Sequence, residues 1–193
     1  MADQFESFED LVKACGKDSY RLEVRNTDSD YAVIAPHGGR IEPDTDMIAR
    51  TIAGADLKLY AFIGRLGKDE ANLHITSTRF NEPEGDALVR SARVAVAIHG
   101  RKRGTGDADE IHMGGANLAA RDAIATALTQ AGFKTANAPP RLAGKEPGNI
   151  CNRCTDKGVQ LELTKPLRQH LKSDAKALQR FAHAIRAGLG LRG

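Results

Sequence analysis

The sequence of 193 residues contains no tryptophan, and aromatic residues make up only 5% of it. Proteins that hold single-stranded nucleic acid stack successive bases on aromatic side chains, so this composition argues against that class. The net charge of +3 is also small. Such a charge permits an anionic ligand but does not require nucleic acid as a partner.

Cysteine is scarce as well, with three residues at positions 15, 151 and 154. An odd and sparse set does not form a disulfide framework. Cys151 and Cys154 form a CxxC pair, but no second pair of Cys or His ligands follows, so we assign this pair no function.

Long apolar runs are missing too. No stretch approaches the ~20 apolar residues of a membrane helix, and the N-terminal residues lack the apolar segment of a secretory signal. We therefore expect a cytoplasmic protein without membrane contact. Release by lysis of the host cell fits the same features.

Apolar runs alternate with helical patterns along the chain. This alternation predicts one α/β domain over residues 1–193, with a mixed, largely parallel sheet flanked by helices. The expected strands are 31–35, 58–66, 73–78, 93–98, 112–114 and 159–163. The expected helices are 5–16, 45–53, 84–91, 117–131 and 166–187, and residues 136–148 form a long connection.

Two of the six histidines end apolar runs and precede a glycine: His37 in "VIAPHGG" and His99 in "VAVAIHG". Side chains at the carboxyl ends of central strands converge on one crevice. Glu42 can join them because glycines permit a sharp turn after His37. Two imidazoles and a carboxylate form a three-ligand zinc set with a position left for water. A tight turn with surface histidines explains the same pattern, and spacing alone leaves both interpretations open.

A second carboxylate lies in the apolar run "GVQLELTKPLR". Glu162 shares a strand face with Gln160, just before a helix. A carboxylate in such surroundings, facing a metal and its water, suits a general base.

The remaining histidines carry weaker signals. We expect His74 and His112 to be core residues or to support the ligands, and His170 and His183 to lie on the surface. The stretch "GRKRGTGD" at 100–107 has the glycines of a phosphate loop but lacks its Gly-Lys-[Ser/Thr] ending. We expect a mobile loop beside His99 whose charge attracts a polyanion.

Five blocks lie in order between about residue 30 and residue 168: "APHGGRIEPDTDMIA", "LHITSTRFNEP", "VAIHG", "HMGGAN" and "NICNRCTDKGVQLELTKPLR". Together they resemble the phage poly-γ-glutamate hydrolase family, whose members have also been labelled phage-related replication proteins. The resemblance implies a zinc carboxypeptidase-like (phosphorylase/hydrolase-like) fold with one Zn²⁺. It implies His37, Glu42 and His99 as zinc ligands and Glu162 as the catalytic glutamate. The implied reaction is hydrolysis of γ-glutamyl amide bonds in poly-γ-glutamate.

Each residue of polyglutamate carries a carboxylate, which arginine grips through two parallel hydrogen bonds. Carboxypeptidases hold a substrate carboxylate with an Asn-Arg pair, and by this loose analogy we favour Asn152 and Arg153. Arg79 and Arg168 are further candidates. Arg79 stands where we would expect a histidine in the family, and Cys154 where glycine is more usual.

Two alternatives remain. The same zinc fold could act as an amidase or carboxypeptidase on another peptide or an acylated amino acid. The second alternative is a nucleic-acid-binding phage replication accessory protein, which the basic residues 101–103 and the family's older label suggest. The scarcity of aromatic residues speaks against it.

Overall fold

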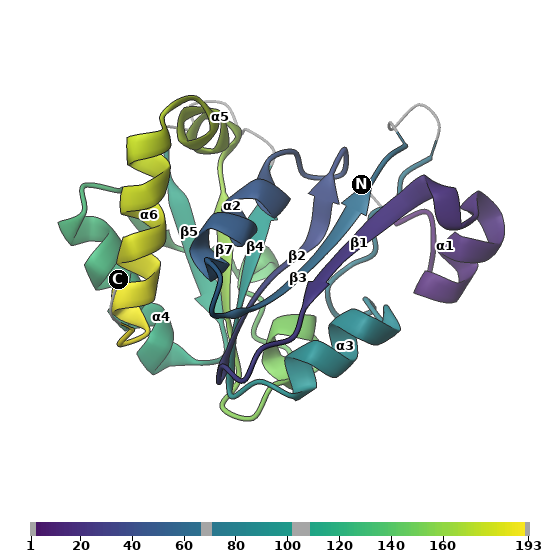
Figure 1. Cartoon of the computed structure of the whole chain (residues 1–193), viewed down its shortest axis with the longest axis horizontal. Coiled ribbons are helices and arrows are strands. Elements are labelled where there is room, and N and C mark those ends of the chain that lie inside the picture. Colours follow the sequence, from purple (N-terminus) through teal and green to yellow (C-terminus); the bar gives the residue numbers. More distant parts are fainter. Residues whose placement is uncertain (1–2, 67–70, 102–108, 192–193) are drawn as a thin grey trace.

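The computed structural model describes residues 3–66, 71–101 and 109–191 (Figure 1). The helices are α1 (Phe8–Cys15), α2 (Thr45–Ala53), α3 (Pro83–Arg90), α4 (Leu118–Gln130), α5 (Lys165–Ser173) and α6 (Ala175–Gly188). The strands are β1 (Tyr20–Arg25), β2 (Tyr31–Gly39), β3 (Lys58–Gly64), β4 (Val94–Gly100), β5 (Ile111–Gly115), β6 (Thr135–Asn137) and β7 (Val159–Leu163). Three short 3₁₀ turns are η1 (Lys17–Ser19), η2 (Pro140–Leu142) and η3 (Ile150–Arg153). None of the α-helices in these described ranges has the length and apolar character of a membrane span.

One seven-stranded sheet runs through the molecule in the order β1-β3-β2-β4-β7-β5-β6. The four central strands β3, β2, β4 and β7 are parallel to one another. β1 is antiparallel to β3, and β5 is antiparallel to β7, while β6 is parallel to β5. The predicted α/β fold with a mixed sheet is thus confirmed.

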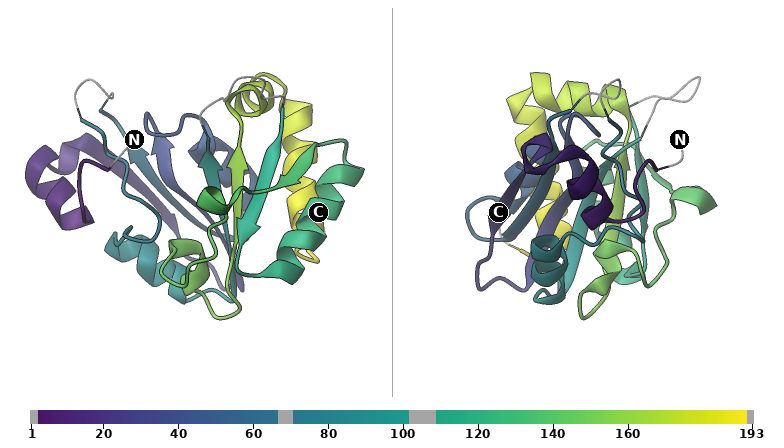
Figure 2. Two further views of the ribbon diagram at one scale, coloured as in Figure 1. Left: turned by 180° about the vertical axis from the view of Figure 1, so that it is seen from behind. Right: turned by 90° about the vertical axis from the view of Figure 1, so that its right-hand side faces the viewer.

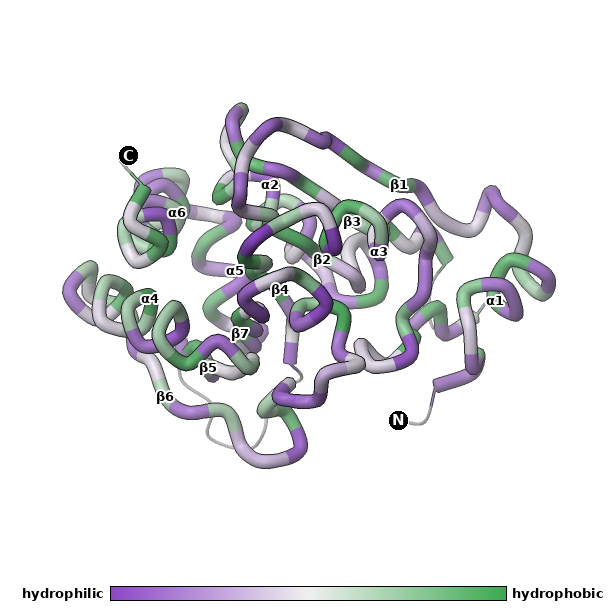
Figure 3. Tube along the Cα trace, turned by 90° about the horizontal axis from the view of Figure 1, so that it is seen from below, coloured by the Kyte–Doolittle hydropathy of each residue, from purple (hydrophilic) through white to green (hydrophobic). Residues whose placement is uncertain are grey.

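The two faces of the sheet carry separate apolar clusters because side chains alternate along each strand. Val33, Val96 and Leu161 pack with α2, α4, α5 and α6 on one face. Ile34 and Ala97 pack with α1, α3 and η3 on the other. Figure 2 shows the two layers from behind and from the side, and Figure 3 shows the hydrophobic central strands between more polar connections. By the same alternation His99 and Glu162 belong to the second face.

The predicted positions of α2 and β7 are confirmed at both ends, but β2 and β4 extend further than expected. β2 continues through Pro36 to Gly39, so the turn comes after the two glycines rather than directly after His37. Gly39 has φ +66°, and a Cβ there would lie 2.4 Å from the carbonyl oxygen of Gly64 on β3. The glycines therefore allow β2 to stay close to β3 while it presents His37.

Two predicted elements are wrong. Residues 73–76 form no regular element and residues 77–78 belong to a turn, so this segment pairs with no strand in the described structure. Their backbone groups bond elsewhere: the carbonyl of Ile75 faces His37, and the amide of Thr76 donates to Asp3. The predicted helix 166–187 is two helices, because Asp174 leaves helical geometry and its carboxylate caps the first turn of α6.

The sequence patterns missed β1 and β6. β1 is an edge strand whose residues are all half-buried or exposed, so it lacks the apolar run that identified the central strands. β6 has only three residues and occupies the start of the predicted connection 136–148.

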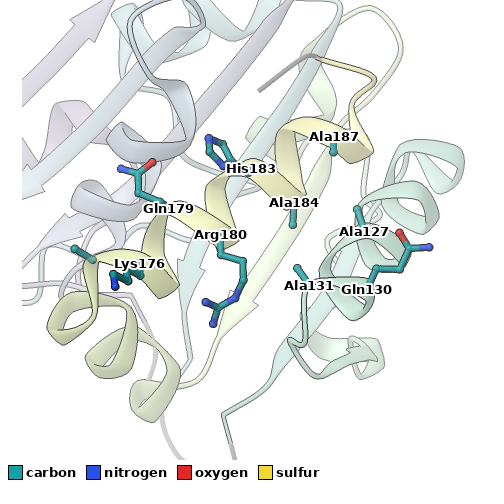
Figure 4. A pocket seen from close by; sticks show the side chains of 10 residues that line it. Ala127, Gln130, Ala131, Lys176, Gln179, Arg180, His183, Ala184 and Ala187 are labelled. Atoms are coloured by element: carbon teal, nitrogen blue, oxygen red, sulfur yellow. The ribbon is translucent and has the colours of Figure 1, made fainter.

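Helices α4 and α6 pack side by side on the first face and leave a depression of about 770 Å³ between them (Figure 4). Alanines line it from both sides: Ala127 on α4 and Ala131 directly after that helix, and Ala184 and Ala187 on α6. His183 lies on its rim, at the surface as predicted. No predicted ligand or catalytic residue lines this depression.

Candidate active site

The carboxyl ends of β2, β4 and β7 lie next to one another and carry His37, His99 and Glu162. His99 and Glu162 are direct partners in the register of β4 and β7. Glu42 returns to the same place through a turn, in which its amide donates to the carbonyl of His37 at 2.8 Å. Four residues up to 125 positions apart in the chain therefore meet at one edge of the sheet.

Three of these side chains form a compact donor group in the described structure. The Nδ1 atoms of His37 and His99 lie 3.2 Å apart. Glu42 lies between them, with Oε1 3.4 Å from His37 Nδ1 and Oε2 3.5 Å from His99 Nδ1. Both imidazoles are buried, with 1% and 3% of their residues' surface exposed. This burial leaves the nitrogens facing one another rather than bulk water.

A contact on the far side of His37 fixes the tautomer of its neutral ring. His37 Nε2 lies 2.8 Å from the carbonyl oxygen of Ile75, which can only accept a hydrogen bond. Nε2 therefore carries the proton, and Nδ1 presents a lone pair toward His99 and Glu42. Ligands bonded to a tetrahedral zinc ion at about 2.0–2.1 Å lie about 3.4 Å from one another. The donor separations here are of that size, so the residues present fit a bound cation.

The electrostatics of the donor group also favour a bound cation. Burial lowers the pKa of His99, but the Glu42 carboxylate outweighs it and raises the pKa overall. Burial raises the pKa of Glu42, but the two imidazoles lower it well below its usual value. Glu42 therefore stays ionised and offers its negative charge to a cation.

Glu162 lies beside the donor group and is buried. Its Oε1 accepts a hydrogen bond of 3.0 Å from Nε2 of Gln160. Burial raises the pKa of Glu162, His99 lowers it and Glu42 raises it, so that the pKa lies above its ordinary value. A raised pKa makes this carboxylate a better acceptor for a proton from water near neutral pH.

A cavity of about 940 Å³ opens onto these four residues. Its wall is rich in basic side chains and also includes Asp44 and Glu146. The basic residues that line it are Arg40, Arg101, Arg141, Lys165 and Arg168. The excess of positive charge suits an anionic substrate.

Arg168 is the most enclosed of these cations, with 5% of its surface exposed. Its guanidinium donates to the carbonyl oxygens of Pro43 and, at 3.4 Å, Leu163. Burial lowers its pKa, while Glu42 and other acidic neighbours raise it, with a net decrease. These backbone contacts hold Arg168 at the edge of the cavity, as its predicted role in substrate binding requires.

Asn152, predicted to bind substrate, has its whole amide engaged within the protein. Its oxygen accepts from the amides of Ala116 and Gly158, and its nitrogen donates to the carbonyls of Gly144 and Glu146. The residue is fully buried and does not line the cavity. Asn152 therefore connects three loops through hydrogen bonds.

The neighbouring candidates Arg153 and Arg79 also face other groups. Arg153 pairs with Asp86 at 2.7 Å and donates to the carbonyl of Gly148. Arg79 pairs with Asp3 at 2.6 Å. Neither lines the cavity, so of the four predicted substrate-binding residues the structure brings only Arg168 to it.

We expect Asn152→Ala to lower stability without a change in substrate affinity. The change leaves buried amide and carbonyl groups without their partner, which costs about 3 kcal/mol and, in a chain of this length, roughly 10 °C in the melting temperature. Thermal unfolding and KM measurement check this. Arg153→Met is the matched neighbour and should also keep its KM; a raised KM in both variants would instead support the predicted Asn-Arg clamp.

Asp3 contacts the segment that lies against His37, a contact that the sequence did not reveal. Asp3 accepts from His74 Nδ1 at 2.7 Å and from the amide of Thr76 at 2.7 Å. Burial raises the pKa of Asp3, but its hydrogen bonds to Thr76, His74 and Arg79 outweigh this and lower the pKa to about 2. The His74 ring packs on His37 with 4.2 Å between ring centroids. Asp3 therefore holds the segment that orients His37, the supporting role predicted for His74.

Other predicted features lie away from the described site. Cys151 and Cys154 are buried in the second apolar cluster, and burial raises the pKa of both thiols, so neither is a reactive thiol. Most of the predicted loop 100–107, including residues 102 and 103 of the basic run, lies outside the described residues.

Comparison with known proteins adds an independent line of evidence. The profile of the poly-gamma-glutamate hydrolase family matches residues 5–184. The SPbeta prophage-derived protein YoqZ of Bacillus subtilis is 31% identical over 173 residues, which cover 88% of this chain and 62% of YoqZ. The chain thus spans less than two thirds of the length of this relative.

Two solved structures share the fold over almost the whole chain. A bacteriophage poly-gamma-glutamate hydrolase superposes with a TM-score of 0.89 at 28% identity, covering 98% of this chain and 97% of that one. YndL in its zinc-free apo form superposes with a TM-score of 0.88 at 27% identity, covering 98% of both chains. From the family match, its extent and these structures, we conclude that the chain belongs to the poly-γ-glutamate hydrolase family.

Proposed function

We propose that residues 1–193 act as one zinc-dependent hydrolase domain that cleaves γ-glutamyl amide bonds in poly-γ-glutamate. Family membership supports the reaction class. The observation that carries the proposal is the group of two imidazole nitrogens and a carboxylate, with Glu162 beside it and a basic cavity in front. Two buried imidazoles and a half-buried carboxylate that face one another support a bound cation rather than a packing role.

We choose zinc as the ion for two reasons. Two neutral imidazoles and a carboxylate are ligands that zinc accepts in catalytic sites, where it keeps a position open. YndL, the relative with the same fold, has been described in a zinc-free form, which implies a zinc-bound one. When bound, zinc would supply Lewis-acid chemistry, polarising an amide carbonyl and making a water molecule acidic enough to attack at neutral pH.

The side chains of this protein would bind the ion, transfer the proton and attract the substrate. His37, Glu42 and His99 would hold the ion. Glu162 would take a proton from the attacking water and later donate it to the leaving amine. Arg168, held at the cavity edge by backbone carbonyls, would attract a carboxylate of the substrate.

A polyanionic substrate also matches the cavity wall. Poly-γ-glutamate carries one carboxylate for each residue, and basic side chains exceed acidic ones around the opening. Because the amide bond runs through the side chain of each residue, every α-carboxylate stays free for recognition. A basic cavity therefore favours this polymer over an uncharged peptide.

The proposal predicts release of new amino groups from γ-linked polyglutamate by the zinc-loaded protein, and no release after chelation of the metal until zinc is restored. The parallel substrates are α-linked polyglutamate and an acylated amino acid. Cleavage of one of these substrates in place of the γ-linked polymer would support a hydrolase but assign it a different substrate. Absence of hydrolysis of all three by protein shown to hold one zinc would refute the proposal.

A further inference from the structure

The side-chain amide of Gln160 links Asn149 and Glu162 through hydrogen bonds. Gln160 Nε2 donates to Glu162 Oε1 at 3.0 Å and to the carbonyl oxygen of Leu142 at 3.2 Å. Gln160 Oε1 accepts from Asn149 Nδ2 at 2.9 Å. Gln160 and Asn149 are both buried, with 5% and 3% of their surface exposed. Buried side-chain amides with all these partners are held in one orientation.

The partners determine which end of the Gln160 amide faces Glu162. A backbone carbonyl can only accept, so the group beside Leu142 must be the NH₂. The same NH₂ faces Glu162 Oε1. Asn149 confirms this orientation, because its own Oδ1 accepts from the amide of Cys151 at 3.1 Å and its Nδ2 is therefore the atom directed at Gln160.

Backbone packing prevents the amide of Gln160 from moving aside. Gly144 approaches so closely that a Cβ there would lie 2.6 Å from Gln160 Oε1. Gly144 also has φ +58°, a conformation that favours glycine. The loop that carries Gly144 and Asn149 thus closes over Gln160 and fixes it against β7.

We infer that Gln160 is a positioning residue that reserves one oxygen of Glu162 for proton transfer. Oε1 is occupied as the acceptor of the Gln160 amide, so a proton that Glu162 takes up is carried on Oε2. This inference rests on the proposed function. In that reaction an O–H bond of water breaks, its proton goes to Oε2, and the hydroxide oxygen adds to the amide carbon. The C–N bond then breaks, and the proton moves from Oε2 to the leaving nitrogen.

Two substitutions test this by different routes. Gln160→Met keeps the side-chain length and removes the donor. Asn149→Asp keeps the oxygen that accepts from Cys151 and replaces the NH₂ directed at Gln160 by an acceptor, which favours the flipped amide with its oxygen toward Glu162. We expect each variant to lose about 10- to 100-fold in kcat, the range for partners that orient site residues. KM and zinc content should stay at parental values.

A double substitution separates positioning from general damage. In a Glu162→Gln background, Gln160→Met should cause no further loss of kcat, because the residue acts through the carboxylate that is already gone. A parental kcat in both single variants, or an equal loss in the presence and absence of Glu162, would overturn the inference. Parent protein that fails to hydrolyse γ-linked polyglutamate would instead count against the proposed function, so the two failures are distinct. If Gln160→Met does not fold, Asn149→Asp decides.

Discussion

Replacing Glu162 by glutamine is expected to abolish most of the turnover of γ-linked polyglutamate while leaving zinc content unchanged. Glutamine keeps the shape of the side chain and can still accept from Gln160 Nε2 through its amide oxygen. It cannot take a proton from water, and loss of a general base costs on the order of 10²–10⁴-fold in rate. Steady-state kinetics and elemental analysis of the same preparation measure the two quantities.

Glu146→Gln is the matched control for this experiment. Glu146 also lines the cavity, so the substitution removes a negative charge there without touching the donor group. We expect it to keep kcat close to that of the parent. Near-parental kcat in Glu162→Gln would remove Glu162 from the role of general base, and loss of zinc in that variant would make it a ligand instead.

The second large effect is expected from the ligands themselves. His99→Ala removes one of two imidazole nitrogens that lie 3.2 Å apart, so the remaining pair cannot hold the ion in competition with water. We expect dialysed protein to contain little zinc and to show no hydrolysis at micromolar metal. His37→Ala should also lose zinc and hydrolysis. This substitution removes in addition the contact to the Ile75 carbonyl, which orients the imidazole.

His183→Ala serves as the control, since this histidine lies on α6 at the α4–α6 depression and away from the donor group. It should retain zinc in full. Circular dichroism must show that each variant is folded, because both ligands end buried strands. A folded His99→Ala protein with one zinc per chain would refute the ligand set.

The sequence was sufficient for the central sheet and for the gathering of His37, Glu42, His99 and Glu162. Apolar runs identify buried parallel strands, and topology brings their carboxyl ends together whatever their separation in the chain. The bounds of β7 were predicted at both ends for this reason, and the helical pattern of α2 also gave both of its bounds. The Asn-Arg pair was predicted by analogy and lies outside the cavity, because the bonds of Asn152 to loop backbones depend on tertiary structure.

Contacts between segments that are distant in the sequence could not be predicted from the sequence. Alternation placed Gln160 on the face of Glu162, but nothing in the local pattern indicated that Asn149 would lie against it. Residues 73–78 have the composition of a strand, and only the contacts with Asp3 and His37 explain why they stay outside the sheet. Composition indicates that a segment is extended, and its neighbours decide what it pairs with.

The contact made by Asp3 affects how a recombinant version of this protein should be built. The family match starts at residue 5, so a chain trimmed to the matched region would retain every proposed zinc ligand and still lack Asp3. His74 and Thr76 would then lose the carboxylate that anchors them behind His37. Cloning boundaries should therefore include residue 3.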